Sequence, residues 1–103
     1  SFCLSISEFK KLEGCSTDGT NNAASFIFAQ IPMAEEACKQ ACTSNPACDF
    51  YMNQFMVCYL GDFEDVNPLP KPPLLFGTID VFLKDDSKET KFNVKIENKR
   101  CLI

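Results

Sequence analysis

The chain has 103 residues with fourteen acidic and ten basic side chains, so it is the size of one small domain of net charge −4 without the basic surface a nucleic acid needs. It contains no histidine, which removes the commonest general base and the commonest metal ligand; we expect a protein that is not an enzyme and holds neither metal nor cofactor. No apolar run approaches the ~18–20 residues of a membrane span, so we expect no membrane insertion.

The first elements are predicted from side-chain pattern and from helix signals. Residues 5–12 fit either a short helix or a strand, and the apolar run 23–31 favours a strand. Residues 32–43 predict a helix, because Pro32 suits its first position and an acidic pair follows in its first turn. The Asn-Pro pair at 45–46 ends it.

The second half of the chain predicts strands. Residues 48–52 and 55–60 favour a β-hairpin around the polar pair 53–54. Proline-rich residues 67–73 indicate a loop, and residues 74–83 a strand with Gly77 as a bulge. Apolar and polar side chains alternate over 90–97, which predicts a further antiparallel strand.

These elements predict an α+β fold in which one helix packs on a curved antiparallel β-sheet. We expect one domain over residues 1–103, with a core at 23–83 and an extra C-terminal strand at 90–97.

The seven cysteines are the most informative feature of the composition. Zinc sites need paired knuckles, and one short gap (Cys38 to Cys42) is the only candidate, so a disulfide framework is favoured over metal. Disulfides predict a secreted protein or one held in a secretory organelle. The chain starts at Ser1, which predicts a mature or excised form that could belong to a longer protein with flanking domains.

Helix geometry restricts the pairing of the two helix cysteines. Cys38 and Cys42 would share one face with Cβ atoms ~5–6 Å apart, which is too far for a bond between them. Each therefore needs a different partner, and the odd number of cysteines leaves at least one without an internal partner.

Residues 34–61 (AEEACKQACTSNPACDFYMNQFMVCYLG) resemble the core of the PAN/apple domain family. The shared pattern is a Cys-x3-Cys helix, an Asn-Pro loop with a third cysteine, an aromatic strand, and a fourth cysteine followed by an aromatic residue and Leu. The resemblance implies a disulfide-stabilised apple-like fold, with Cys42 paired to Cys48 and Cys38 to Cys58.

The family also joins an N-terminal cysteine to one near the C-terminus. Cys101 is the terminal candidate, and its partner is Cys3 or Cys15. The spacing from Cys15 to Cys38 is closer to the family pattern, but pairing of the extra strand with the N-terminal segment favours Cys3–Cys101. Cys15 is then the odd thiol, available for an interchain disulfide.

The resemblance implies an adhesion module, as in coagulation-type proteases and microneme proteins, that binds a protein receptor or a carbohydrate. The acidic charge favours a neutral glycan over a sulfated one. Candidate ligand residues are Tyr51 and Tyr59, which could stack on a sugar, and Asp62 in an acidic loop. The alternative is a structural or assembly module of a larger secreted protein, disulfide-linked through the odd cysteine.

Overall fold

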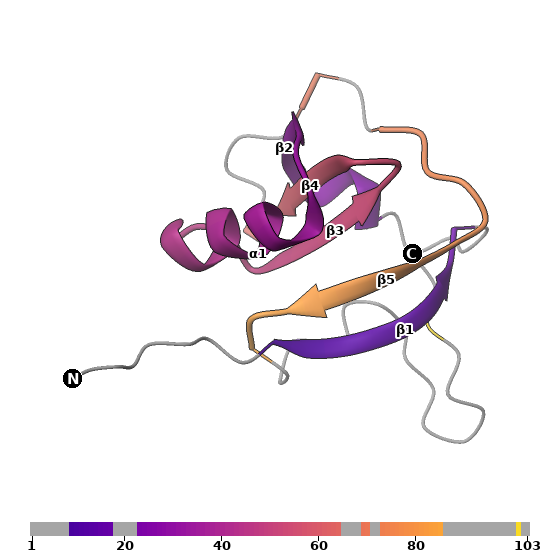
Figure 1. The fold of residues 1–103 in the computed structure, drawn as a ribbon, viewed down its shortest axis with the longest axis horizontal. Coiled ribbons are helices and arrows are strands. Elements are labelled where there is room, and N and C mark those ends of the chain that lie inside the picture. Colours follow the sequence, from indigo (N-terminus) through magenta and orange to yellow (C-terminus); the bar gives the residue numbers. More distant parts are fainter. Residues whose placement is uncertain (1–8, 18–22, 65–68, 71–72, 86–100, 102–103) are drawn as a thin grey trace.

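The computed structural model describes residues 9–17, 23–64, 69–70, 73–85 and 101. They form one helix and a five-stranded antiparallel sheet with the strand order β1-β5-β3-β4-β2, as Figure 1 shows. The elements are β1 (Lys10–Ser16), a short 3₁₀ turn (Ala23–Phe26), β2 (Ile27–Pro32), α1 (Glu35–Ser44), β3 (Phe50–Gln54), β4 (Val57–Gly61) and β5 (Thr78–Leu83). The predicted α+β class, with one helix on an antiparallel sheet, is confirmed.

Helix α1 begins three residues later than predicted. Pro32 is the last residue of β2, paired with Val57, and does not start the helix. Ala34 is still extended, with φ −71° and ψ 163°, so the helix begins at Glu35. It ends at Ser44, because Asn45 before the proline is extended, as predicted.

The β3–β4 hairpin turns two residues later than predicted. Gln54 pairs with Val57, which places Phe55 and Met56 in the turn with φ of +54° and +63°. The polar pair predicted for the turn lies in β3 instead. Asn53 Nδ2 donates to the Met33 carbonyl at 2.9 Å, so its polarity serves a contact with a neighbouring loop.

The outer strands also depart from the predicted ranges. The ambiguous N-terminal segment is a strand that begins at Lys10, with a register shift between Leu12 and Cys15 beside Gly14, whose φ is +62°. The strand predicted at 23–31 starts with the 3₁₀ turn, and the strand predicted at 74–83 begins at Thr78 after Gly77. The strand predicted at 90–97 lies outside the described residues.

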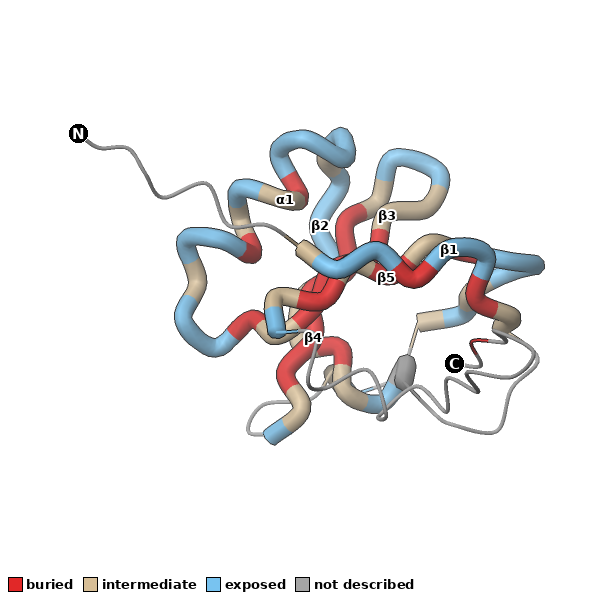
Figure 2. Tube along the Cα trace, turned by 90° about the horizontal axis from the view of Figure 1, so that it is seen from below, coloured by how far each residue is buried: buried red, intermediate tan, exposed pale blue. Residues whose placement is uncertain are grey.

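The central strands β3 and β4 are covered on both faces of the sheet. On one face α1 packs against β3 and β4 around the cysteines of the helix and Tyr51 and Leu60. On the other face Phe50, Met52 and Tyr59 pack with residues of β1 and β5 and beneath loop residues such as Phe63. Figure 2 shows these buried positions along the central strands, so no open sheet face is left over β3 and β4. Between residues 50 and 61 the exposed residues are therefore those of the turn, Phe55 and Met56.

Candidate functional site

Two of the three disulfides tie α1 to the neighbouring strand and loop. Cys38 bonds to Cys58 in β4, and Cys42 bonds to Cys48 in the loop before β3, with S–S distances of 2.11 and 2.03 Å. These are the pairings that the resemblance implies, and they satisfy the geometric requirement for separate partners. They fix the middle and the C-terminal part of α1 relative to β4 and to the loop before β3.

The third disulfide corrects a prediction. Cys15 bonds to Cys101, so Cys15 is not the odd thiol and the expected Cys3–Cys101 pair is wrong. The reason is that Cys15 lies on β1 with its side chain in the core, and the backbone N–H of the next residue, Ser16, donates to the Cys101 carbonyl at 2.9 Å. Cys3 lies outside the described residues. Because the other six cysteines are paired, the odd cysteine by count is Cys3.

Tyr51, predicted to meet a ligand, is buried beneath the helix. It is 2% exposed, stacks on Phe82 with ring centroids 4.7 Å apart, and meets the ring of Phe9 edge-on at 5.0 Å. Burial, and then the negative charges of Glu35 and Glu36, raise the pKa of Tyr51 to about 12. Its role is in packing, and it marks a region of negative potential at the start of α1.

Tyr59 and Asp62 are also buried, so neither is available as a surface contact. Tyr59 packs in the core on the face opposite α1, and burial raises its pKa. Asp62 is 8% exposed, and its carboxylate accepts the Glu64 N–H at 2.9 Å, which stabilises the turn after β4. All three predicted ligand residues are thus buried and contribute to the packing and turns of the fold.

The exposed large apolar side chains of the described residues include both residues of the hairpin turn, which lies at the end of β4 opposite to Asp62. We call Ile31, Phe55, Met56, Leu74 and Phe76 the tip surface. Phe55 is 78% and Met56 64% exposed, although both are large apolar residues. The sequence reasoning missed them because it placed the turn at the preceding polar pair, which would have left both in a half-buried strand.

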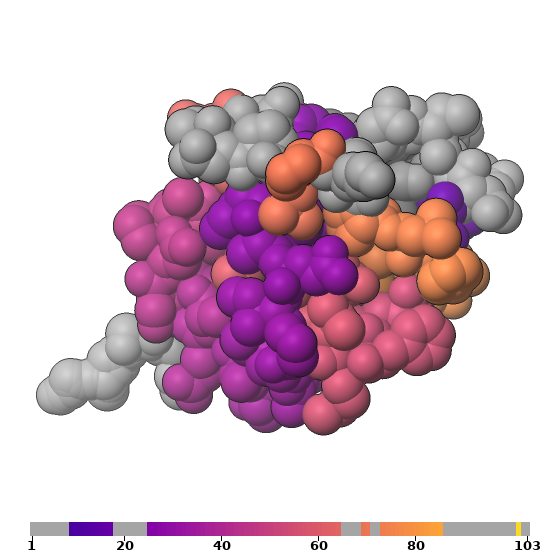
Figure 3. Space-filling view, turned by 90° about the horizontal axis from the view of Figure 1, so that it is seen from above, coloured from indigo at the N-terminus to yellow at the C-terminus, as the bar shows by residue number. Residues whose placement is uncertain are grey.

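Three segments are held together at the tip surface. The Met56 carbonyl accepts the Met33 N–H at 3.0 Å, which joins the turn to the end of β2. The carboxamide of Gln54 pairs with the backbone of Phe76, with Nε2 donating at 2.8 Å and Oε1 accepting at 3.2 Å. Figure 3 shows β2, the hairpin and the segment before β5 bordering one another on one face.

A cavity of about 310 Å³ adjoins this tip. It exists because β3 and β5 pair only at Phe50–Leu83 and Tyr51–Phe82, so the rest of the two strands is not hydrogen-bonded together. We call it the β3–β5 cavity. The residues that line it are Glu35 from α1, Asn53 and Gln54 from β3, and Thr78, Ile79, Asp80 and Phe82 from β5.

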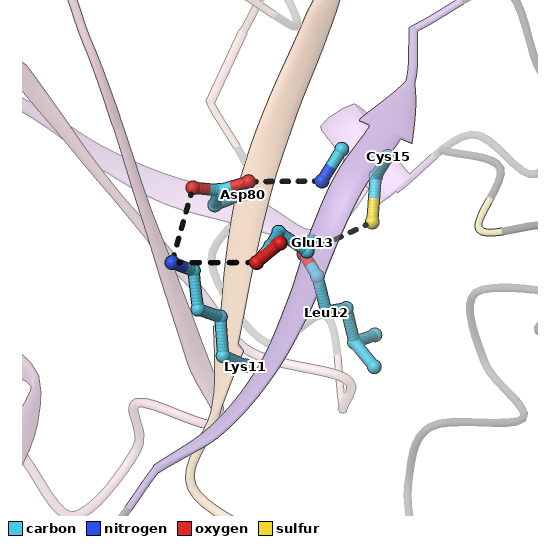
Figure 4. A network of polar contacts seen from close by, with 6 residues as sticks. Lys11, Leu12, Glu13, Cys15 and Asp80 are labelled. Carbon is cyan, nitrogen blue, oxygen red and sulfur yellow. Dashed lines mark hydrogen bonds and ion pairs between the residues drawn. The ribbon is translucent and has the colours of Figure 1, made fainter.

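Asp80 is held in place from β1, as Figure 4 shows. One carboxylate oxygen accepts the Gly14 N–H at 2.9 Å, and the other lies 3.7 Å from Lys11 Nζ. Lys11 is also 3.8 Å from Glu13 and lies over the Phe82 ring, 5.9 Å from its centroid. A single lysine thus faces two carboxylates on this side of the cavity.

Comparisons of the chain with protein-family models, with curated proteins and with solved structures find no match. Within the described ranges, no group of three or more side chains is arranged to hold a metal ion. No helix of the described part of the chain has the length and apolar character needed to cross a bilayer. Within the described part of the chain, the tip surface and the β3–β5 cavity are the features considered for function.

Proposed function

We propose that the chain is a non-catalytic binding module of a secreted protein, of the PAN/apple type, and that it recognises another protein through the tip surface. The observation that carries this proposal is the exposure of Phe55 and Met56 in a turn whose backbone neither residue favours. The family resemblance of residues 34–61 and the three disulfides support an extracellular setting.

The turn conformation is unfavourable for the residues it contains. Positive φ at a residue with a Cβ costs about 1–2 kcal/mol, and two-residue turns with two positive φ values strongly prefer Asn-Gly. Phe55 and Met56 occupy both positions and bury little of their apolar surface. Strained conformations concentrate at binding sites, where the residue type serves the interaction. Phe55 and Met56 are therefore unfavourable for the stability of the fold but suitable for contact with a binding partner.

The charge around the tip surface selects the partner. Glu35 and Glu36 begin α1 just after Ala34, and the preceding residue, Met33, is hydrogen-bonded to Met56, so carboxylates border the apolar surface. The whole chain carries −4, which opposes pairing with a second copy and adsorption to anionic lipid. A protein segment with apolar side chains flanked by Lys or Arg is complementary to such a surface.

A displayed library of random peptides tests this proposal. We expect the immobilised protein to enrich peptides with aromatic or aliphatic anchors, and the double variant Phe55→Ser with Met56→Ser to lose them. Glu64→Gln, a charge change at an exposed position beyond the other end of β4, should bind as the wild type does. Selection of the same peptides by the serine variant would refute a binding role for the tip surface.

A glycan array is the second arm of this experiment. Binding of neutral glycans that survives the serine variant, together with an empty peptide selection, would replace protein recognition with carbohydrate recognition.

The odd cysteine favours one alternative, a structural module linked to another chain. Six of the seven cysteines form internal disulfides, so Cys3 is the one that could bond elsewhere. Electrophoresis with and without reductant tests this alternative. A band of twice the monomer mass that disappears on reduction and in Cys3→Ser would support it, and a monomer in both lanes would eliminate it.

A further inference from the structure

The β3–β5 cavity presents oxygen atoms that are free to accept hydrogen bonds. Among the described residues, Glu35 forms no ion pair, and neither the Thr78 hydroxyl nor Asn53 Oδ1 has a hydrogen-bond partner. The Asp80 oxygen that faces Lys11 is 3.7 Å from its ammonium, outside hydrogen-bond distance. All four groups can accept from a ligand that enters.

Each carboxamide of the cavity has one of its two N–H donors engaged with the backbone. Asn53 Nδ2 donates to the Met33 carbonyl at 2.9 Å, and Gln54 Nε2 donates to the Phe76 carbonyl at 2.8 Å. Lys11 at the border is shared between Asp80 and Glu13. The free acceptors of the lining thus outnumber its free donors, and two of them are the charged carboxylates of Glu35 and Asp80, whereas a sugar hydroxyl group is neutral and both donates and accepts.

Phe82, the aromatic residue of the cavity, has no free ring face on which a pyranose could stack. Tyr51 stacks on Phe82 at 4.7 Å with the ring planes 8° apart. The Lys11 ammonium lies over the same ring, 5.9 Å from its centroid, and reaches it from β1, on the opposite side of β5 from β3. Stacking on a sugar ring would require one of these two contacts to be displaced.

We infer that the β3–β5 cavity binds the ammonium or guanidinium group of a lysine or arginine side chain, held between the carboxylates of Glu35 and Asp80. Such a group brings three to five N–H donors to a site that offers acceptors. The carboxylate of Glu35, which also acts on the buried Tyr51, lines the cavity and attracts the cation.

This inference deepens the proposed function and rests on it, because the cavity and the tip surface are adjacent. Gln54 lines the cavity, and the next residue, Phe55, is at the turn. One bound segment could therefore place apolar side chains on the tip surface and a basic side chain in the cavity. The basic residue would fix the position of the segment along the protein, and the apolar residues would contribute most of the affinity.

Small probes test the cavity separately from the tip surface. Nα-acetyl-arginine amide and Nα-acetyl-lysine amide are titrated into ¹⁵N-labelled protein, with Nα-acetyl-leucine amide and methyl β-galactoside as neutral arms. We expect saturable shifts of the Glu35, Asn53, Thr78 and Asp80 amides with the two cations alone. Glu35→Gln should weaken binding about fivefold to tenfold, whereas Glu64→Gln, which removes the same charge elsewhere, should not change it.

Equal shifts with methyl β-galactoside, absence of shifts with the cations, or unchanged affinity in Glu35→Gln would each overturn the inference. The two proposals fail in distinguishable ways. If the cavity binds arginine amide but no peptide depends on Phe55 and Met56, the tip proposal alone is wrong. If peptides require the tip surface yet bind Glu35→Gln normally and share no basic residue, the cavity inference alone is wrong.

Discussion

Replacing the turn residues by the pair that the turn geometry prefers should stabilise the protein. The double variant Phe55→Asn with Met56→Gly keeps the backbone path of the hairpin, in which the two φ values are +54° and +63°. Asparagine tolerates this region and glycine adopts it without a steric penalty. The native side chains are 78% and 64% exposed, so little core packing is lost with them.

The size of the effect follows from three contributions. Relief of two positive φ values, at about 1.5 kcal/mol each, is worth about 3 kcal/mol, and the greater freedom of glycine in the unfolded chain offsets about 0.7 kcal/mol of it. Loss of the buried fraction of the two side chains offsets about 1 kcal/mol more. The free energy of unfolding should thus rise by about 1 kcal/mol, which for a domain of this size raises Tm by roughly 4–8 °C.

Differential scanning calorimetry and urea titration measure this change. The matched control is Phe55→Ser with Met56→Ser, which removes the apolar side chains but leaves two residues with a Cβ at positive φ, and it should gain no stability. A Tm of the Asn-Gly variant at or below the wild-type value would show that the turn is not strained. Phe55 and Met56 would then not be residues kept for binding at the expense of stability.

Three further predictions concern the frame that holds the tip surface. Gly61→Ala should lower the free energy of unfolding by about 3 kcal/mol or prevent folding, because a Cβ there overlaps the buried Phe50 ring. A urea midpoint within error of the wild-type value would contradict this prediction. Replacing Cys15 and Cys101 by alanines should lower the free energy of unfolding by about 4–5 kcal/mol, because this disulfide closes a separation of 86 residues. The same replacement of Cys42 and Cys48, which are six residues apart, should lower it by about 2 kcal/mol. Equal losses of stability in urea titrations would contradict this order. Because the fold raises the pKa of Tyr51 from 10.0 to about 12, the unfolded chain loses this proton first, and stability should fall as pH rises from 10 to 12. Absorbance of the phenolate follows this titration without interference from tryptophan, and a Tyr51 that ionises near 10 in the folded protein would contradict it.

Short-range sequence patterns predict the end of α1 and the need for separate partners of its two cysteines well. The Asn45-Pro46 pair marks the end of α1, and helix geometry requires different partners for Cys38 and Cys42, which the structure supplies. These features depend on residues a few positions apart, so short-range rules are sufficient for them.

The candidate sites depend on interactions that no local pattern carries. The turn lies at Phe55 and Met56 because Asn53 and Gln54 use their carboxamides on the Met33 and Phe76 backbones, 20 and 22 residues away in sequence. A polar pair in a strand and an apolar pair in a turn contradict local preference, and tertiary contacts decide the outcome. The β3–β5 cavity likewise requires two strands to separate after two paired residues, which their sequences do not indicate.

The affinity of one selected peptide for three forms of the protein tests the central claim most directly. Isothermal titration should give wild-type affinity for Glu64→Gln and at least tenfold weaker binding for Phe55→Asn with Met56→Gly, the more stable protein, because truncation of an aromatic anchor commonly costs about 2 kcal/mol or more. If the tip surface is the binding site, the turn variant should lose binding and gain stability at the same time. Equal affinity for the wild type and the turn variant would contradict it.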